Sequence, residues 1–466
     1  MSTSMNRPSQ TLVTLWETPG LKEKIFFTLA MLGLYRFGAH VPMPGIDQMR
    51  LEALFGGGNS LGAFFDLFSG GALAKFSVFA LGVTPYINAS IIMQLMTQVI
   101  PKLEELQKEG GEAGRKKIQQ WTRYLTIVLG LVQAVTLVNW MWASNAVLGF
   151  QNGQGGFPLM FFVTTSVTLI AGTILIMWMG ELITERGIGN GASLLIMASI
   201  LSRLPDYFAQ TAEGVTTGAY SWLSVLVLVA SFLAILVAII VVQEGARRVP
   251  VQAAKRQVGG RLLQGKVSYI PFKVNQGGVM PIIFASSLML FPITVASWVN
   301  GGQAPRAAAA DWHVLTATFW NLSNLKAAAL QAIQLVLTQL GTFGAVYAVV
   351  YFLLIVFFSY FYAGLVLNPA ELANNLMKHG NFIPGVRPGR ESAEYLEGVL
   401  NRITFLGAIF LGVVALLPNW VEDATKITSF RGLGSTALLI MVGVAVDLFN
   451  QLQTQLLSRR YEGFME

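Results

Sequence analysis

Few side chains in this 466-residue sequence are of the kinds that catalyse reactions or bind metals. The sequence contains no cysteine, which excludes disulfides, thiolate metal sites and cysteine nucleophiles. Its three histidines, His40, His313 and His379, are scattered, and no carboxylate–histidine motif accompanies them. We therefore expect no enzyme activity, no metal and no cofactor.

Two glycine-containing stretches look like nucleotide-binding motifs, but each departs at a required position. Residues 260–266 (GRLLQGK) nearly match a phosphate-binding loop, yet Val267 stands where Ser or Thr is needed and no apolar strand precedes them. Residues 187–191 (GIGNG) are followed by Ala192 where a dinucleotide fingerprint has glycine. We interpret the first as a basic loop and the second as a tight turn.

Lys and Arg are concentrated in two long loops. Segment 244–277 has seven basic residues against the single acid Glu244, and segment 368–402 presents Arg387 and Arg390 in a Gly/Pro-rich turn. Basic residues in cytoplasmic loops also set topology and contact lipid headgroups. Because a topogenic signal needs only a few of them, we interpret these loops as a docking platform for an acidic or RNA-containing partner.

The elements that must position these loops are long and apolar. Hydrophobic residues make up 54% of the chain and charged residues 12%, about half the ~25% usual in soluble domains. A helix needs ~20 apolar residues to cross a bilayer. The sequence predicts an all-α polytopic membrane protein with about ten transmembrane helices, in segments 25–41, 76–100, 124–147, 158–182, 191–208, 222–242, 278–299, 341–367, 403–420 and 433–457.

The distribution of Lys and Arg predicts the orientation of these helices. With the N-terminus inside, the inner segments hold 23 of the 31 basic residues and the outer segments hold 7, while Arg36 lies within the first span. The positive-inside rule therefore predicts that both termini are cytoplasmic.

Two stretches of the sequence repeat each other at a constant offset of 196 positions. Residues 82–90 (GVTPYINAS) and 278–286 (GVMPIIFAS) share six identical residues, and each begins an apolar segment. Five predicted helices separate them, so the second and seventh spans run in opposite directions and the halves form an inverted repeat. At 1.5 Å per residue, Ile87 and Ile283 then lie ~15–18 Å into the membrane, near its midplane. Chance similarity in a chain rich in Gly and Ile is the alternative.

The predicted midplane carries aliphatic side chains, which bears on the class of transported substrate. Ion-coupled transporters usually keep ionisable residues near the midplane, whereas Arg36, Glu181 and Asp447 lie near span ends, within reach of the interface or a partner. An aliphatic constriction suits a polypeptide of varied chemistry and disfavours ion leak. Ordinary helix packing predicts the same residues, and a secondary transporter of a small solute or a structural scaffold are the alternative functions.

A short segment precedes the second span. Asn59 and Ser60 can cap a helix over 61–68 that Gly70 and Gly71 end. It is too short to span the bilayer. It is either an interfacial loop helix or a re-entrant element buried by protein.

Taken together, these stretches closely resemble the SecY family, the central subunits of the protein-conducting channel of bacterial membranes. The resemblance covers nearly the whole chain. It rests on residues 68–73, 80–87, 183–191, 254–257, 284–287, 290–292 and 384–389.

The resemblance implies an hourglass pore between two five-helix halves. Unfolded polypeptides would cross the plasma membrane through it, and transmembrane segments would leave it sideways into lipid. The implied hydrophobic ring consists of Val83, Ile87, Ile196, Ile283 and Ile440. Val83 departs slightly from the usual isoleucine, and the place of Ala192, one turn before Ile196, is left undecided.

Three further sites follow from the resemblance. A plug on the outer side of the ring contains Ser60, Leu61, Phe64, Phe65, Asp66, Phe68, Gly70 and Gly71. A lateral gate between the second and seventh spans contains Asn88, Ile91, Ile92, Ser286, Ser287 and Phe291. The surface that docks the motor and the ribosome contains Arg247, Arg248, Lys255, Arg256, Arg387 and Arg390.

The resemblance also implies partners, and with the spans it implies a division of the chain. The partners are SecE, SecG, the SecA ATPase, the ribosome with its nascent chain and RNA, secretory preproteins and membrane lipid. Partners supply the energy, because nothing here binds nucleotide. The division is a cytoplasmic segment 1–24, an N-terminal half 25–215 with the plug near 59–73, a C-terminal half 216–457 with loops 244–277 and 368–402, and a cytoplasmic tail 458–466.

Overall fold

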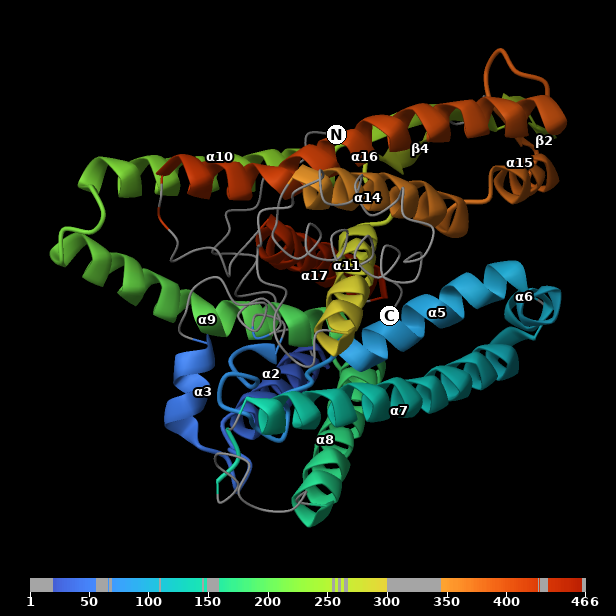
Figure 1. Cartoon of the computed structure of the whole chain (residues 1–466). Helices are drawn as coiled ribbons and strands as arrows, with labels where there is room; N and C mark the ends of the chain where they lie inside the picture. The colour runs from blue at the N-terminus through green and yellow to red at the C-terminus, as the bar shows by residue number, and fades with distance from the viewer. Residues whose placement is uncertain are drawn as a thin grey trace, which may run out of the picture.

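The computed structural model is largely helical (Figure 1). It describes residues 20–55, 66, 69–108, 110–144, 146–148, 159–253, 256–258, 261–263, 267–299, 345–425, 427 and 435–462.

Apart from two isolated β-bridges, the described residues of the N-terminal half form helices and turns. Its long helices are joined by short helices and turns. The helices are α2 (Leu21–Ala39), α3 (Gln48–Phe55), α5 (Thr84–Val99), α6 (Pro101–Lys108), α7 (Gly111–Ala143), α8 (Leu159–Arg186) and α9 (Gly191–Thr216).

The C-terminal half adds a small sheet to its helices. The helices are α10 (Trp222–Glu244), α11 (Met280–Val299), α14 (Ala345–Val366), α15 (Pro369–Lys378), α16 (Arg390–Thr425) and α17 (Ser435–Glu462). The strands are β1 (Ala246–Ala253), β2 (Arg256–Val258), β3 (Arg261–Leu263), β4 (Val267–Lys273) and β5 (Asn381–Phe382).

The two halves meet through the repeated helices. In Figure 1 the helices α2 to α9 fill the lower part of the view, and most of the C-terminal half lies above them. Contact between the halves is made where α5 packs against α11 and where α9 packs against α17. The short helices α6 and α15 and the strand β2 all lie toward the right of the view in Figure 1, so the connections after α5, α10 and α14 are on the same side of the molecule.

Observed helices lie at all ten predicted spans, and three of them begin eight or more residues from the predicted start. The helix α5 begins at Thr84 rather than at residue 76, because the preceding segment consists of turns in which Phe76 and Gly82 have positive φ. The helices α7 and α16 begin earlier than predicted, because their first turns are polar and hydropathy detects only the apolar remainder. By length and composition, six helices of the described residues can cross a membrane: α7, α8, α10, α14, α16 and α17.

The repeat is visible in the backbone. Gly82 has a φ of 57° and Gly278 a φ of 59°, a left-handed conformation that favours glycine. Each helix then begins two residues later, and each has proline as its second residue, where a missing N–H costs nothing. Ile87 and Ile283 are therefore the fourth residues of α5 and α11. The estimated depths of Ile87 and Ile283 assumed helical rise from Lys75 and from Lys273, and that assumption was wrong because the two helices begin only at Thr84 and Met280.

The segment after α10 folds as strands rather than as the predicted loop. The strand β1 pairs antiparallel with β4, and its end pairs with β5 from the second basic loop. Val249 and Val251 are buried between exposed neighbours, the alternation of a strand with one covered face. The two basic loops therefore form one structural unit.

Three apolar clusters organise the interior. The largest joins α2, α5, α9, α10, α11, α14 and α17. A second lies between α7, α8 and the turns before α5, and a third lies under the sheet against α15 and α16. On the outside, α10 leaves Trp222, Leu223 and Val241 more than 60% exposed, as expected for a helix that faces lipid.

Candidate functional site

The five predicted ring residues lie in one apolar cluster. Val83 directly precedes α5, and Ile87 lies in its first turn; Ile283 comes from α11, Ile196 from α9 and Ile440 from α17. None of them is more than 7% exposed. The helix α11 packs against α5 and α17, and α17 packs against α9, so residues from both halves meet there. Because an ordinary helix core would bury the same side chains, the ring itself stays a prediction.

Ala192 and the start of α9 lie beside this cluster. Ala192 is partly buried and packs against it. The N-terminus of α9 is fixed by the side chain of Asn190, which accepts a hydrogen bond from the backbone N–H of Ser193 at 3.3 Å. The backbone of Gly191 lies so close to Gly180 of α8 that a side chain could not fit. The stretch GIGNG is thus a tight helix–helix connection, as interpreted from the sequence.

The chemistry available around the cluster is mainly that of apolar contact. Among the described residues, no group of three or more His, Asp or Glu side chains is placed to bind a metal ion. Of the three charges predicted near span ends, Glu181 forms a bidentate ion pair with Arg123, at 2.8 Å and 3.0 Å, and accepts a hydrogen bond from Gln119. That carboxylate therefore has a structural partner that ties α7 to α8.

Part of the predicted plug is described. Ser60, Leu61, Phe64, Phe65 and Phe68 lie outside the described residues.

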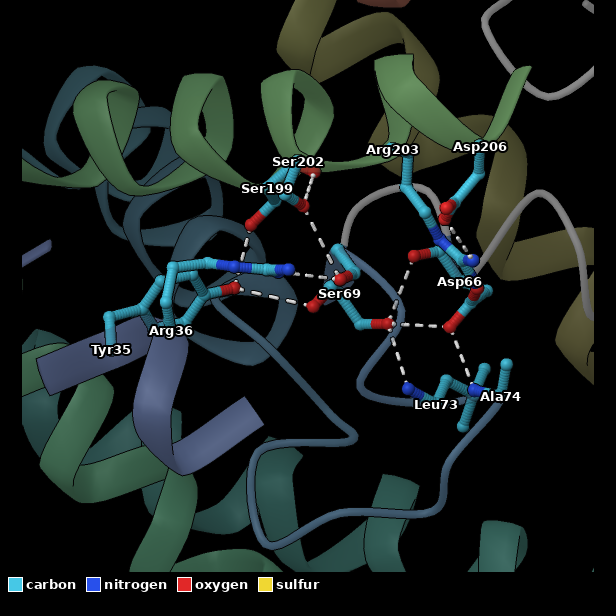
Figure 2. Close-up of polar contacts among 11 residues, drawn as sticks. Tyr35, Arg36, Asp66, Ser69, Leu73, Ala74, Ser199, Ser202, Arg203 and Asp206 are labelled. Atoms are coloured by element: carbon cyan, nitrogen blue, oxygen red, sulfur yellow. Dashed lines mark hydrogen bonds and ion pairs between the residues drawn. The ribbon is translucent and has the colours of Figure 1, made fainter. Parts of the chain in front are cut away.

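The described plug residues, Asp66, Gly70 and Gly71, are all buried. Asp66 forms an ion pair with Arg203 of α9, and the carbonyl oxygen of Gly70 accepts a hydrogen bond from Arg36 of α2 at 2.7 Å (Figure 2). The structure therefore joins this segment to two helices of the N-terminal half.

The predicted gate residues lie on two helices that contact each other, α5 and α11. Ile91, Ser286 and Ser287 are buried, whereas Asn88 and Ile92 are partly buried. The side chain of Phe291 lies outside the described residues. Sequence reasoning missed one contact between the halves: the hydroxyl of Tyr362 on α14 donates a hydrogen bond to Gln94 on α5 at 2.5 Å.

The sheet joins the two loops that carry the predicted docking residues. Arg247 and Arg248 are exposed on β1, and the pairing of Gln252 with Phe382 joins this strand to the second basic loop. Arg387 and Arg390 are 87% and 91% exposed and form ion pairs with Glu391 and Glu394 one turn on. Arg256 lies on β2, but its side chain is outside the described residues, as is the whole of Lys255.

Comparison with known proteins identifies the family. The model of the SecY family matches residues 77–449. The protein translocase subunit SecY of Synechococcus elongatus is 45% identical over 461 residues, which cover 98% of this chain and 97% of that protein.

Solved structures share the fold at low sequence identity. One of them is a SecY structure whose plug domain is described as stabilising the closed state of the translocation channel and maintaining a membrane seal. It is 18% identical to this chain with a TM-score of 0.61, and the match covers 93% of this chain and 92% of the other. Another is Sec61 in the canine ribosome–channel complex, which is 17% identical with a TM-score of 0.57; this match also covers 93% of this chain and 92% of the other.

The matches extend over both repeated helices and over the segments that carry the predicted sites. On the identity and coverage of these relatives, the chain belongs to the SecY family.

Proposed function

We propose that the chain is the pore-forming subunit of a protein-conducting channel in the bacterial plasma membrane. It moves unfolded polypeptides across the membrane and releases apolar segments into lipid. The observation that carries this proposal is the meeting of α5 and α11, two copies of one inverted motif, at buried aliphatic side chains. Membership of a family of translocase subunits supports the same function.

The ring closes around a chain because its side chains are aliphatic. Val83, Ile87, Ile196, Ile283 and Ile440 offer a substrate no charge and no hydrogen bond to hold. Water and ions gain nothing by entering such a constriction, whereas side chains of a passing polypeptide can displace the branched groups. The channel is passive, and its partners supply the energy.

Below the ring, the segment that contains Asp66, Gly70 and Gly71 acts as the plug. Between α5 and α11 lies the lateral gate. A segment with enough apolar side chains leaves the pore there, because its free energy is lower in lipid than in an aqueous channel. The hydrogen bond from Tyr362 to Gln94 links the halves while the gate is closed.

The docking surface lies on the sheet and on the turn before α16. Arg247, Arg248, Arg387 and Arg390 project from one unit and suit an acidic or phosphate-rich partner. SecA and the translating ribosome bind there, while SecE and SecG complete the channel. Both termini face the cytoplasm, and the halves divide near residue 216, between α9 and α10.

The proposal is tested by reconstituting the chain with SecE and SecG in vesicles. With SecA and ATP, a secretory preprotein should become protected from added protease, and SecA-independent uptake of solutes should not occur. A small solute taken up in response to a proton or sodium gradient, without preprotein protection, would favour the alternative of a secondary transporter. The relatives, which are translocase subunits and channels, give that alternative no support.

A further inference from the structure

The base of the proposed plug is fixed to α2 and α9 by a network of polar contacts (Figure 2). We name this network the latch. It consists of Tyr35 and Arg36 from α2, Asp66, Ser69 and Gly70 from the plug base, and Ser199, Ser202, Arg203 and Asp206 from α9.

The carboxylate of Asp66 is the centre of the latch. One oxygen accepts hydrogen bonds from the backbone N–H of Ala74 at 2.7 Å and from the hydroxyl of Ser69 at 3.1 Å. The other oxygen pairs with Arg203. The side chain of Asp66 is only 5% exposed, so separating it from Arg203 without another partner would leave a buried charge uncompensated.

Further hydrogen bonds from α2 and α9 hold the same segment. The carbonyl oxygen of Gly70 accepts from Arg36 at 2.7 Å and from Ser202 at 3.5 Å. The hydroxyl of Tyr35 lies 2.6 Å from that of Ser199 and donates to the carbonyl oxygen of Ser69 at 3.4 Å. These contacts depend on the position of the backbone and are lost if the segment moves away.

Arg203 has a second carboxylate within reach. Asp206, one turn further along α9, lies 3.3 Å from the other terminal nitrogen of the guanidinium group and is 55% exposed. The guanidinium group therefore bridges a buried carboxylate on the plug base and a solvated one on its own helix. If Asp66 departs, Arg203 already has a partner.

We propose that Arg203 changes partner when the channel opens, giving up Asp66 and keeping Asp206, so that the latch sets the threshold for release of the plug. Asp66 stabilises the closed state, and Asp206 lowers the cost of leaving it. The two carboxylates thus act in opposite directions on one arginine. This inference rests on the proposed function of the channel.

The test measures the resting ion conductance of the channel in planar bilayers and its export of a preprotein with a weakened signal sequence. Asp66→Asn keeps the shape of the side chain and removes its charge, and Arg203→Gln removes the partner. Each should raise resting conductance about tenfold, the size of change expected for losing a charge-assisted hydrogen bond. Because both substitutions remove the same interaction, the resting conductance of the double variant should be close to that of either single variant.

Asp206→Asn tests the opposite effect, in which opening becomes harder. It leaves the buried pair intact and removes the second partner, so it should lower export of the weakened preprotein and leave resting conductance no higher than in the parent. Arg50→Gln is the matched control, because it makes the same arginine change at a surface ion pair at the start of α3, where the side chains of Arg50 and Asp47 are 39% and 22% exposed and little effect is expected.

The outcomes separate the latch from the channel. If Asp66→Asn and Arg203→Gln match Arg50→Gln at equal amounts of folded protein, the latch is overturned. If those two variants do not accumulate as folded protein, the Asp206→Asn variant decides alone. Export of the weakened preprotein equal to that of the parent would then overturn the latch. Translocation of a normal preprotein by the parent is measured in the same vesicles: its absence would overturn the channel, whereas its presence beside inert latch variants would overturn only the latch.

Discussion

The apolar cluster at Ile87 and Ile283 and the polar latch at Asp66 join parts of the molecule by different physical means. Around the isoleucines, contacts are short-ranged and without direction, so any side chain of suitable size can replace another. Around Asp66, every contact requires a donor or a charge at one position. A seal must open for polypeptides of varied sequence, and contacts without direction suit that task. Release of a plug must respond to one event, and directional polar contacts suit that one.

The difference also appears in how each region uses the repeat. The apolar cluster receives side chains from both copies of the motif, among them Ile87 and Ile283. In the described residues, the latch is built from the N-terminal half alone, from α2, the plug base and α9. We infer that the apolar cluster, to which both copies of the motif contribute, seals the channel. The latch, which belongs to the N-terminal half, regulates its opening.

The largest effect on closure is expected from the apolar side. Ile87→Gly with Ile283→Gly removes two buried side chains, each worth about 2–5 kcal/mol by the usual cost of truncation in a core, and should open a path for ions. Conductance in planar bilayers should rise well above that of the parent. Ile403→Gly, at a buried position of the cluster under the sheet, is the control: it should lower stability without raising conductance. Equal conductance of all three proteins would place Ile87 and Ile283 in ordinary core.

A smaller effect is expected where the plug base meets α9. A side-chain carbon added at Gly70 would lie 2.8 Å from the Cα of Ser199, and its φ of 66° already favours glycine. Gly70→Ala should therefore displace the segment and raise resting conductance, though less than the isoleucine variant.

The control for Gly70→Ala is Gly218→Ala between α9 and α10. Gly218 has a φ of 75° and open space around it, so the change carries only the backbone cost of about 1–2 kcal/mol. If both alanine variants conduct alike, the close approach to Ser199 has no part in closure.

A third prediction concerns the contact between the halves. Tyr362→Phe removes the hydrogen bond to Gln94 at a cost of about 0.5–1.5 kcal/mol and should ease separation of α5 from α14. Segments of marginal hydrophobicity should then enter lipid more often, as measured by glycosylation or protease mapping of a test protein. Tyr360→Phe, on the exposed side of the same helix, should leave insertion unchanged. The link is contradicted if the two variants behave alike.

The smallest effect on closure is expected at the docking surface. Arg387 is 87% exposed and its ion pair with Glu391 spans 3.8 Å, so Arg387→Glu should change stability by less than about 1 kcal/mol. Resting conductance should match the parent, while SecA-driven export falls because the charge of the surface is reversed. Normal export would remove Arg387 from the docking role.

How much could be predicted from the sequence differs between the two regions. The buried isoleucines are found because their motif occurs twice, and the same glycine conformation and proline position recur at both copies. The latch was missed because Asp66 and Arg203 are far apart in the chain and only the fold joins them. Arg203 lies near the outer end of the predicted span 191–208. A charged side chain there can reach the membrane interface, so it is tolerated without a partner.

The fold of the two basic loops was predicted only in part. The excess of basic residues identified the two loops, but their pairing through β1 and β5 was not foreseen. The alternating residues of β1 (ARRVPVQA) are a strand signal that charge counting concealed. The start of α5 was misplaced for a related reason, since hydropathy cannot distinguish a buried turn from a helix.

The central claim is that a polypeptide passes between Ile87 and Ile283. It is tested most directly by placing a photocrosslinking amino acid at each position and stalling a secretory chain in membrane vesicles with SecA engaged. Adducts to the stalled chain from both positions are the predicted result. If neither position reacts while the chain is demonstrably engaged, these isoleucines are ordinary core and the pore lies elsewhere.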